Sequence, residues 1–511
     1  VNGGDITLGW QAQMKIYNSG LSLITYNEDQ AAFVEIILSE VHDYVTFAVD
    51  YGIDGAQATQ NKNATVKILI DGVEVSSEKV KSNSAQKVFS TDVKGKRVVR
   101  LEAYGAEGAC VSFGDATFYT DGVSAAGKVI TNIKCGAWPA PVSRNYNLYG
   151  GSMVIGGEQM DYGYCFNSVG SFDLIIGGEY NFLQSYVGID DAVAGGENSG
   201  SATITATVYD KDDKILSTTQ TPVLYGYMSA YKLCINVKDG YKVNFLIGDG
   251  GDGIANDMTV IGNPVFSNTL DGGKIYLSDA ALEGEVGSGT LGIDKHTDNS
   301  AFNYTVNSTA IKYNKGVGLY LKNANYEEYV SDKTDYTKFA YVRTDIEGLG
   351  YKFFETTIAD ANSQGAYYEI WVDGKCIAST GALNSFAQDK SARPYRFAAK
   401  LPEDGKTFEL RAISKNGNQN GKVALGNAAF YSGDEYLTNM YAESEVKSSD
   451  GNYSFTRGVD KKGDYVKMYK NGELRSVGDC LVSGVGAQYT FDISNSSGDT
   501  FTAGVWFIKG Y

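Results

Sequence analysis

The sequence has few of the residues on which enzymes most often rely. Only two of its 511 residues are histidine, His42 and His296, and they lie at unrelated positions. No HExxH, GxSxG or phosphate-binding pattern occurs in the chain, and no glycine-rich run opens a predicted helix after a strand, as a dinucleotide-binding fingerprint requires. Because no nucleophile–base pair and no metal-binding motif is visible, the sequence predicts a protein that is not an enzyme.

Cysteine is also scarce and scattered. No two cysteines have CxxC spacing, so neither a zinc finger nor a thioredoxin-like redox site is indicated. We expect most of the thiols to be free and buried, and one or two disulfides are the alternative for an exported protein. The six cysteines are Cys110, Cys135, Cys165, Cys234, Cys376 and Cys480.

Two further absences limit the partners of the protein. No stretch approaches the roughly 18 consecutive apolar residues that a membrane-spanning helix needs. No cluster of lysine and arginine offsets the formal net charge of −17 and the pI of about 4.7. A surface of this sign repels phosphate backbones and anionic lipids. The sequence therefore predicts neither nucleic-acid binding nor direct membrane insertion.

Glycine and tyrosine are abundant, with 61 and 37 residues, beside only six prolines. Short runs of alternating apolar and polar residues, separated by turns that contain glycine, are typical of β-strands. Long apolar patterns with a period of 3.6 residues, which would indicate helices, are absent from the sequence. The sequence therefore predicts an all-β fold in which helices are few and short.

A five-residue motif occurs three times and indicates that the chain repeats. Each copy consists of Gly, then Asp or Asn, two small residues and Phe, at Gly114–Phe118, Gly262–Phe266 and Gly426–Phe430. The copies are 148 and 164 residues apart, which is the size of a domain rather than of a solenoid repeat. Because each copy ends a similar run of predicted strands, we call it the closing motif and interpret the chain as tandem copies of one β-domain.

Other elements recur in the same order and set the domain boundaries. A Gly-apolar element begins at Gly20, Gly163 and Gly316. The central strand ends in Gly-Ile-Asp at Gly52–Asp54 and Gly188–Asp190 in the first two copies, and the third copy departs from this pattern. The first copy lacks the opening strand of the others. The predicted β-sandwich domains are 1–124, 125–270, 271–432 and an incomplete 433–511.

The last segment, 433–511, is predicted to be the N-terminal part of a fourth β-sandwich. It has an opening strand and the recurring Gly458–Lys461, but it ends soon after Trp506, within the expected central strand. Half a sandwich cannot bury its own core. Either the segment comes from a longer array, or a neighbouring molecule supplies strands by β-augmentation.

Taken together, these elements resemble NPCBM-type modules, which are related to family 51 carbohydrate-binding modules. The third copy carries the opening as Tyr276–Asp279 and the Gly-apolar element as Lys315–Tyr320, and the first two copies carry the Gly-Ile-Asp strand. The resemblance extends over nearly the whole chain. It implies tandem jelly-roll or galactose-binding-like β-sandwich domains that bind carbohydrate without catalysis.

Three acidic residues are candidates for binding sugar. Asp54, Asp190 and Asp191 lie where the central strand enters a loop, and their carboxylates could accept hydrogen bonds from sugar hydroxyls. The alternative is that they cap the turn through hydrogen bonds from backbone N–H groups.

Carbohydrate sites usually also contain an exposed aromatic ring that stacks on the sugar. Trp10 and Trp138 lie in loop-like sequence and are the candidates for this contact. Trp371 and Trp506 lie within predicted strands, so we expect them in the core.

One acidic, glycine-rich run is a candidate metal site. Calcium takes several oxygen ligands from flexible loops, and the run 248–257 contains Asp249, Asp252 and Asp257. These three residues are the predicted ligands of a structural calcium ion, the only cofactor that the sequence suggests. An acidic turn without metal is the alternative.

The function predicted from the sequence is non-catalytic, adhesive recognition of carbohydrate by an extracellular or cell-surface protein. Its partners would be glycans or a cell-surface polysaccharide, bound by several weak sites acting together. Glycoside hydrolysis needs only two carboxylates at a fixed distance, but small repeated sandwiches offer no single deep cleft for them. Two alternatives stay open: structural repeats of a surface fibre, stalk or layer that self-associate into filaments, and an accessory region of a larger glycoside hydrolase.

Overall fold

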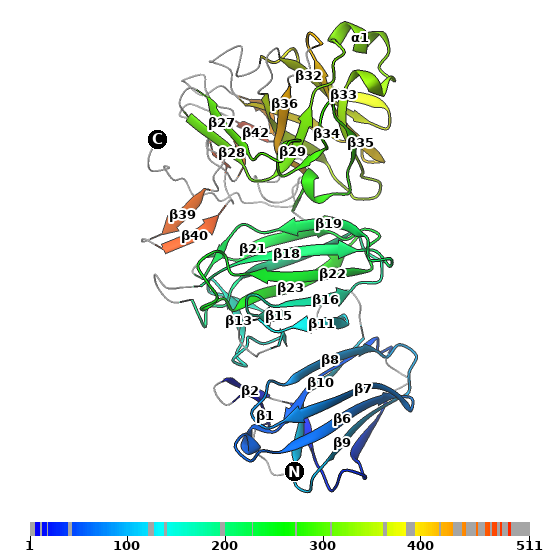
Figure 1. The fold of residues 1–511 in the computed structure, drawn as a ribbon, viewed down its shortest axis with the longest axis vertical. Helices are drawn as coiled ribbons and strands as arrows, with labels where there is room; N and C mark the ends of the chain where they lie inside the picture. The colour runs from blue at the N-terminus through cyan, green and yellow to red at the C-terminus, as the bar shows by residue number, and fades with distance from the viewer. Residues whose placement is uncertain are drawn as a thin grey trace. The chain divides into compact units, whose positions relative to one another are not determined.

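The computed structural model of the chain describes most residues up to 432 and six short stretches beyond it (Figure 1). The gaps before 432 are 1–5, 11–12, 18, 39–42, 121–126, 137–140, 195–199, 227, 271–272, 307–308, 361–364, 385–393 and 418–420. The stretches beyond it are 442–445, 456–457, 466–470, 473–477, 481–482 and 489–491. The chain forms two compact units, Val1–Ser267 and Asn268–Tyr511.

The described residues form antiparallel β-sheets with very little helix, so the all-β prediction is confirmed. The helical elements are α1 (Tyr326–Ser331) and the single 3-10 turns η1 (Gly55–Gln57), η4 (Leu277–Asp279) and η5 (Tyr336–Lys338). None of the described helices has the length or the apolar character to cross a membrane. The five described cysteines are free thiols, and Cys165 and Cys234 are buried.

The first β-sandwich has two four-stranded sheets, in the orders β3-β10-β5-β8 and β4-β9-β6-β7. A separate hairpin, β1–β2, contacts β5 and β10 of the first sheet. The strands are β1 (Ile6–Trp10), β2 (Gln13–Tyr17), β3 (Gly20–Ile24), β4 (Ala32–Ile37), β5 (Thr46–Ile53), β6 (Asn63–Ile70), β7 (Val73–Lys81), β8 (Lys87–Asp92), β9 (Val98–Gly105) and β10 (Cys110–Tyr119).

The second β-sandwich has sheets in the orders β12-β15-β23-β17-β21 and β11-β16-β22-β18-β19, and β20 also pairs with β18. Its separate hairpin is β13–β14. The strands are β11 (Ile130–Lys134), β12 (Ser143–Arg144), β13 (Met153–Ile155), β14 (Glu158–Met160), β15 (Gly163–Phe166), β16 (Ser171–Ile175), β17 (Phe182–Ile189), β18 (Ser201–Tyr209), β19 (Ile215–Gln220), β20 (Leu224–Tyr225), β21 (Tyr231–Asn236), β22 (Lys242–Gly248) and β23 (Thr259–Ser267).

The third β-sandwich repeats this arrangement, with sheets β26-β29-β36-β31-β34 and β25-β30-β35-β32-β33 and the hairpin β27–β28. β24 also pairs with β36. The strands are β24 (Lys274–Tyr276), β25 (Glu283–Glu285), β26 (Gly292–Ile293), β27 (Phe302–Val306), β28 (Thr309–Tyr313), β29 (Gly316–Tyr320), β30 (Ala340–Asp345), β31 (Phe353–Asp360), β32 (Ala366–Val372), β33 (Lys375–Ser379), β34 (Tyr395–Lys400), β35 (Thr407–Ser414) and β36 (Lys422–Tyr431).

Beyond residue 432 the described stretches form three antiparallel pairs, β37–β42, β38–β41 and β39–β40. The interpretation of 433–511 as part of a fourth sandwich, and the boundaries 124, 270 and 432, stay predictions. The six strands are β37 (Ala442–Glu445), β38 (Thr456–Arg457), β39 (Lys467–Lys470), β40 (Glu473–Val477), β41 (Leu481–Val482) and β42 (Tyr489–Phe491).

The three sandwiches share one strand plan. The strand with the closing motif (β10, β23 or β36) lies between the strand of the Gly-apolar element (β3, β15 or β29) and the central strand (β5, β17 or β31). The facing sheet packs alternate side chains inward, as in β6, where exposed or half-buried residues alternate with buried ones. The central strand β5 is instead buried along its whole length, because the hairpin β1–β2 also contacts it.

The closing motif has the same backbone geometry in each sandwich. Asp115, Asn263 and Asn427 have left-handed φ angles of 48°, 45° and 51°. The pairing with the central strand shifts register at each of these places, so the residue sits in a β-bulge. Asp and Asn enter the left-handed region more readily than other residues with a side chain, which explains why the motif carries one or the other.

The glycine before each bulge is explained by the hairpin that packs on it. A Cβ atom at Gly114, Gly262 or Gly426 would lie 2.3, 2.3 or 2.4 Å from a side-chain carbon of the hairpin, well inside contact distance. Each of these glycines is also paired with the first glycine of the Gly-apolar element. The hairpin side chains are Tyr17, Met160 and Tyr313.

The first sandwich differs from the other two at one side. In the second and third sandwiches, short strands pair with the outer strands of both sheets: β12 and β11 with β15 and β16, and β26 and β25 with β29 and β30. The equivalent strands of the first sandwich, β3 and β4, are edge strands among the described residues.

Candidate functional site

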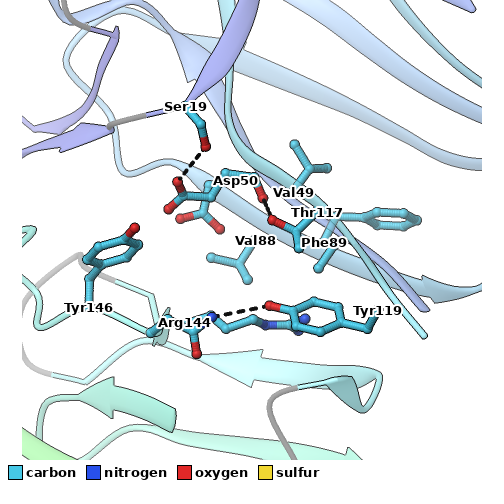
Figure 2. A pocket seen from close by; sticks show the side chains of 12 residues that line it. Ser19, Val49, Asp50, Val88, Phe89, Thr117, Tyr119, Arg144 and Tyr146 are labelled. Atoms are coloured by element: carbon cyan, nitrogen blue, oxygen red, sulfur yellow. Dashed lines mark hydrogen bonds between the residues drawn. The ribbon is translucent and has the colours of Figure 1, made fainter. Parts of the chain in front are cut away.

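One pocket of the first compact unit lies between the first two sandwiches. Strands β5, β8 and β10 form one wall, and residues 144–146, which begin in β12, form the other. Its volume is about 120 Å³. Figure 2 shows Asp50 and Arg144 on opposite sides of the pocket, Tyr119 at the end of β10 beside Arg144, and Tyr146 at the margin. We call this cavity the inter-repeat pocket.

A buried lysine joins both sandwiches beside the pocket. Lys15, on the hairpin β1–β2, is only 2% exposed. Its Nζ atom lies 3.3 Å from Asp50 Oδ2 and donates a hydrogen bond to Ser143 Oγ of the second sandwich at 3.1 Å. Tyr17 also donates to Asp50 Oδ2, at 2.7 Å. Burial, followed by the Asp50 charge, raises the pKa of Tyr17 well above its usual value, so Tyr17 is a hydrogen-bond donor at neutral pH.

Asp115, the bulge residue of the first closing motif, lines the same pocket. Its Oδ1 atom accepts a hydrogen bond from Ser19 Oγ at 3.4 Å, whereas its buried Oδ2 atom accepts none. Lys15 Nζ is 3.8 Å from Oδ2, which is an ion pair without a hydrogen bond. Burial raises the pKa of Asp115. One carboxylate oxygen therefore keeps its capacity to accept a hydrogen bond.

Arg144 is the complementary group. It is 8% exposed, and both of its terminal guanidinium nitrogens are buried without a hydrogen-bond partner. The guanidinium carbon lies 5.6 Å from the ring centre of Tyr119 and 5.9 Å from that of Tyr164. Asn145 Nδ2 holds the Tyr119 hydroxyl at 3.3 Å. A buried cation with unused donors is costly unless an acceptor is supplied.

The equivalent bulge residue of the second sandwich is used differently. Asn263 Oδ1 accepts hydrogen bonds from the backbone N–H groups of Asp161, at 2.9 Å, and Tyr162, at 3.3 Å. The side chain there closes its own loop, whereas Asp115 lines the pocket and keeps one buried oxygen without a donor. Sequence reasoning missed Asp115 and Arg144 as site residues. The available signal was that the first closing motif alone has Asp where the other two have Asn.

Asp54, a predicted sugar ligand, caps a turn. It is the N-cap residue of η1, and its Oδ1 atom accepts a hydrogen bond from Ala56 N at 2.9 Å. Its Oδ2 atom accepts one from Ser112 Oγ at 2.7 Å. The structure therefore gives Asp54 the capping role that was the alternative, and both of its carboxylate oxygens have partners.

Asp190 and Asp191 accept hydrogen bonds from the backbone of the hairpin β13–β14, and Asp190 also accepts one from Asn147, before the hairpin, and one from Ala192. Asp190 is fully buried and accepts hydrogen bonds from Ala192 N, Val154 N and Asn147 Nδ2 at 2.9, 3.1 and 3.2 Å. Burial raises its pKa in spite of these bonds. Asp191 accepts from two consecutive backbone N–H groups in the turn between β13 and β14, at 2.8 and 2.7 Å. A sugar-binding role for either residue stays a prediction.

The predicted stacking residues cannot be placed around the pocket. Trp138 lies outside the described residues, and Trp10 ends β1 with a side chain outside the described part of the structure. Trp371 is half-buried in β32, where its Nε1 atom donates to Glu369 at 2.8 Å. Trp506 lies outside the described residues as well.

The predicted calcium ligands do not form a cluster. Among the described residues there is no group of three or more His, Cys, Asp or Glu side chains that could hold a metal ion. Asp249 Oδ1 accepts a hydrogen bond from Gly251 N at 3.1 Å, as in an ordinary turn, and Asp252 is exposed. The side chains present thus do not supply a calcium site by themselves, and calcium stays a prediction.

Asp257 is the unusual member of the predicted calcium ligands. It is 1% exposed, Ser168 Oγ donates to its Oδ2 atom, and its Oδ1 atom accepts no hydrogen bond. Burial raises the pKa of Asp257 to about 6. Its charge at neutral pH is therefore poorly compensated by the residues around it.

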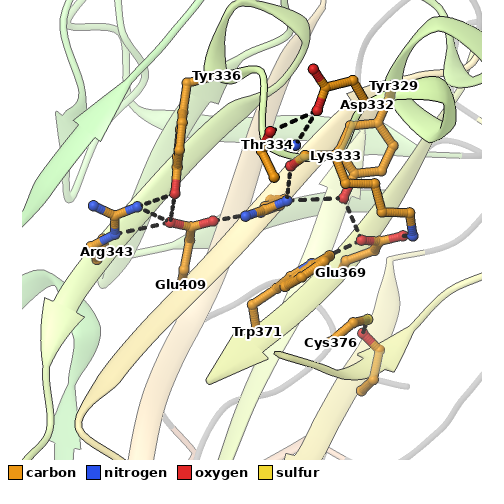
Figure 3. A network of polar contacts seen from close by, with 12 residues as sticks. Tyr329, Asp332, Lys333, Thr334, Tyr336, Arg343, Glu369, Trp371, Cys376 and Glu409 are labelled. Carbon is orange, nitrogen blue, oxygen red and sulfur yellow. Dashed lines mark hydrogen bonds and ion pairs between the residues drawn. The ribbon is translucent and has the colours of Figure 1, made fainter. Parts of the chain in front are cut away.

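A second polar cluster, in the third sandwich, is complete in itself (Figure 3). The nearly buried Arg411 donates to Glu409 at 2.5 Å and to Tyr329 at 3.3 Å. Glu369 accepts from Tyr329, Trp371 and Lys333. Because each charge in the cluster has an opposite charge or a hydrogen-bond partner, we assign it a structural role: it attaches the α1 segment to the sheet.

The histidines do not form a catalytic site in the described residues. His296 is 5% exposed, its ring packs edge-on against Phe302 and Tyr304, and Tyr304 OH lies 3.0 Å from its Nε2 atom. Burial lowers its pKa to about 4, so it is a neutral core residue. His42 lies outside the described residues.

Comparison with known families gives one domain match. Residues 128–267 match the model of the family described as NPCBM/NEW2 domain. No match to the chain was found among curated proteins.

Several solved structures are similar at low identity. The tandem CBM51 modules of Sp3GH98, the family 98 glycoside hydrolase from Streptococcus pneumoniae SP3-BS71, are 15% identical over 60% of this chain and 97% of that one, with a TM-score of 0.24. CBM51 from Clostridium perfringens GH95, in complex with methyl-galactose, is 16% identical over 31% and 99%, also at 0.24. CBM51-2 and INT domains from Clostridium perfringens ZmpB, with GlcNAc, are 14% identical over 53% and 43%, at 0.24.

The fold assignment rests on the sheet topology and on the domain match rather than on these similarities. The match spans all strands of the second sandwich, β11 to β23. Residues 128–267 thus match the NPCBM/NEW2 domain, the family whose motifs the sequence resembles.

Proposed function

We propose that the chain is a non-catalytic array of β-sandwiches that recognises carbohydrate. The observation that carries this proposal is the match of residues 128–267 to the NPCBM/NEW2 domain, a family of binding modules. The shared strand plan extends the proposal to the flanking sandwiches, because the bulge and its glycine recur in all three. Catalysis finds no support in the described residues, whose one histidine is a neutral core residue.

The array form suits weak binding. Individual polar sites on small sandwiches bind single sugars modestly, and several sites on one chain gain affinity through their effective concentration. We place the protein outside the cell or on its surface, with glycans or a surface polysaccharide as partners. The net charge of −17 favours neutral partners over nucleic acid and anionic lipid.

A glycan-array screen of the full chain, with and without calcium, tests the proposal. We expect retention on a subset of host or plant glycans, and competition by a soluble monosaccharide. A chain denatured by heat serves as the control for non-specific retention. No retention on any glycan, combined with filaments that grow with protein concentration, would show that the repeats serve assembly instead.

Self-association is the second candidate, and one observation favours it. Large apolar side chains are exposed on the edge strands of the first sandwich, Ile24 (66%) on β3 and Phe33 (52%) and Ile37 (81%) on β4, and Tyr26 (65%) is exposed in the segment between these strands. Edge strands with exposed apolar residues pair readily with another chain, so a second copy is the proposed occupant. In sedimentation velocity, Ile37→Lys should abolish any oligomer, whereas Leu246→Lys, at an exposed position of the interior strand β22, should not.

Calcium is kept as a proposal with one supporting observation, the Asp257 Oδ1 atom that accepts no hydrogen bond. A bound cation would satisfy this oxygen. Its test is a rise in Tm with added calcium that Asp257→Asn removes.

A further inference from the structure

We propose that the inter-repeat pocket binds an uncharged sugar ring through Arg144 of the second sandwich and Asp115 of the first. This inference rests on the proposed function, and it names a site that only the two sandwiches together create. Both belong to the same compact unit, Val1–Ser267.

The first argument is the unused hydrogen-bonding capacity of Arg144. Arg144 lines the pocket and is only 8% exposed. Both of its terminal guanidinium nitrogens are buried without an acceptor. Leaving charged donors unsatisfied costs more than leaving neutral ones. Oxygen atoms of a ligand, or water in its absence, would supply the missing acceptors.

The second argument is the opposite capacity of Asp115. Its Oδ2 atom is buried and accepts no hydrogen bond, and the residue lines the same pocket. A ligand that fits must therefore accept from a guanidinium and donate to a carboxylate. Hydroxyl groups do both, and a sugar ring carries several of them at fixed spacing.

The third argument is charge. The pocket region contains two cations, Lys15 and Arg144, and two carboxylates, Asp50 and Asp115. Lys15 Nζ lies 3.3 Å from Asp50 Oδ2 and 3.8 Å from Asp115 Oδ2. The formal charges of these four groups cancel. An anionic ligand would meet Asp115, and a cationic ligand would meet Arg144, so an uncharged ligand fits best.

The size and the walls of the pocket fit part of a sugar. A volume of about 120 Å³ is well above the roughly 10–15 Å³ that one water needs, so one edge of a ring can enter. Tyr119, beside Arg144, and Tyr146, at the margin, supply aromatic surface (Figure 2). Tyr119 is held by Asn145, so its ring is already oriented before a ligand arrives.

The repeats themselves provide a conservative test variant. Asp115→Asn keeps the left-handed bulge, because Asn263 and Asn427 have nearly the same φ at the equivalent positions. It removes only the carboxylate charge and one acceptor. Asn427→Asp is the matched control: the reciprocal change at the same bulge of the third sandwich. Arg144→Gln, which keeps a polar donor but removes the guanidinium, is the second variant.

The experiment is isothermal titration calorimetry on the full chain. Methyl-galactose and N-acetylglucosamine are the uncharged probes, and glucuronate is the anionic probe. We expect at least one uncharged probe to bind, and Asp115→Asn and Arg144→Gln to weaken that binding by about 10- to 100-fold each, the range for a hydrogen bond to a charged group. Asn427→Asp should bind as the unchanged chain does.

The outcomes separate this inference from the proposed function. If uncharged probes bind and both variants keep the original affinity, the pocket is not the site, although carbohydrate recognition stands. If neither the probes nor any arrayed glycan binds, both proposals are overturned. If glucuronate binds through Arg144 and the uncharged probes do not bind, the ligand of the pocket is anionic and the proposal of an uncharged sugar is overturned. A crystal soaked with the uncharged probes that shows only water in the pocket would also overturn it.

Discussion

Replacing Asp257 by asparagine should stabilise the second sandwich at neutral pH and change it little near pH 4. The carboxylate is 1% exposed, and one of its oxygens accepts no hydrogen bond. Burial raises its pKa from 3.8 to about 6. The folded protein therefore holds this proton more tightly than the unfolded chain does.

The sign of the pH dependence follows from that difference. An acid with a raised folded pKa contributes no penalty while both states are protonated, and its penalty grows as pH rises from about 4 through 6. Each tenfold difference in proton affinity is worth about 1.4 kcal/mol, so the free energy of unfolding falls by at most about 3 kcal/mol above pH 7. Near pH 4 the same difference amounts to only about 0.5 kcal/mol.

Asparagine has nearly the shape of the protonated acid and carries no charge, so Asp257→Asn should remove the penalty. Differential scanning calorimetry of the full chain, with EDTA to exclude divalent cations, measures the effect at pH 4 and pH 7.5. We expect Tm to rise by up to about 10 °C at pH 7.5, at roughly 2–4 °C per kcal/mol. Asp212→Asn, in the exposed turn between β18 and β19, is the control without a pH-dependent effect. A Tm that falls equally at both pH values would refute the reasoning.

Two further comparisons test how the sandwiches are built. Gly114→Ala should lower the free energy of unfolding by about 1–3 kcal/mol, because the new Cβ would lie 2.3 Å from the ring of Tyr17. Gly262→Ala meets a flexible methionine side chain instead, so it should lower the free energy of unfolding by less. Urea denaturation measures both variants, and equal losses would contradict the packing explanation. Arg411→Met should lower the free energy of unfolding by about 3–5 kcal/mol, because it leaves buried carboxylates without their cation. Its control, Lys406→Ala, breaks an exposed ion pair and should lower the free energy of unfolding by less than about 1 kcal/mol. A small effect at Arg411 would mean that the cluster does not hold the third sandwich together.

The closing motif illustrates what can be predicted from the sequence. A bulge needs a residue that tolerates a positive φ, and Asp or Asn meets this need within a single position. A strand that lies under a hairpin needs glycine, again at a single position. Both requirements are local, so they recur as letters in the sequence and reveal the repeat. The alternation of apolar residues in strands such as β6 likewise reveals the fold class.

The candidate site residues show the limit of such reasoning. The sequence shows that Asp54 and Asp190 follow the central strand, but not whether their oxygens face a ligand or the backbone. The structure gives both of them backbone and side-chain donors. Their hydrogen-bond partners lie up to 58 residues away in the sequence, so no local pattern announces them.

The sequence by itself determined that the chain is all-β, repeated and rich in tight turns, and that it resembles carbohydrate-binding modules. These properties depend on backbone conformation and on the alternation of side chains, which neighbouring residues encode. Only the tertiary structure decided that Asp115 and Arg144 meet at one pocket. They belong to different sandwiches, and the packing of one sandwich against the other places their unused hydrogen-bonding groups together.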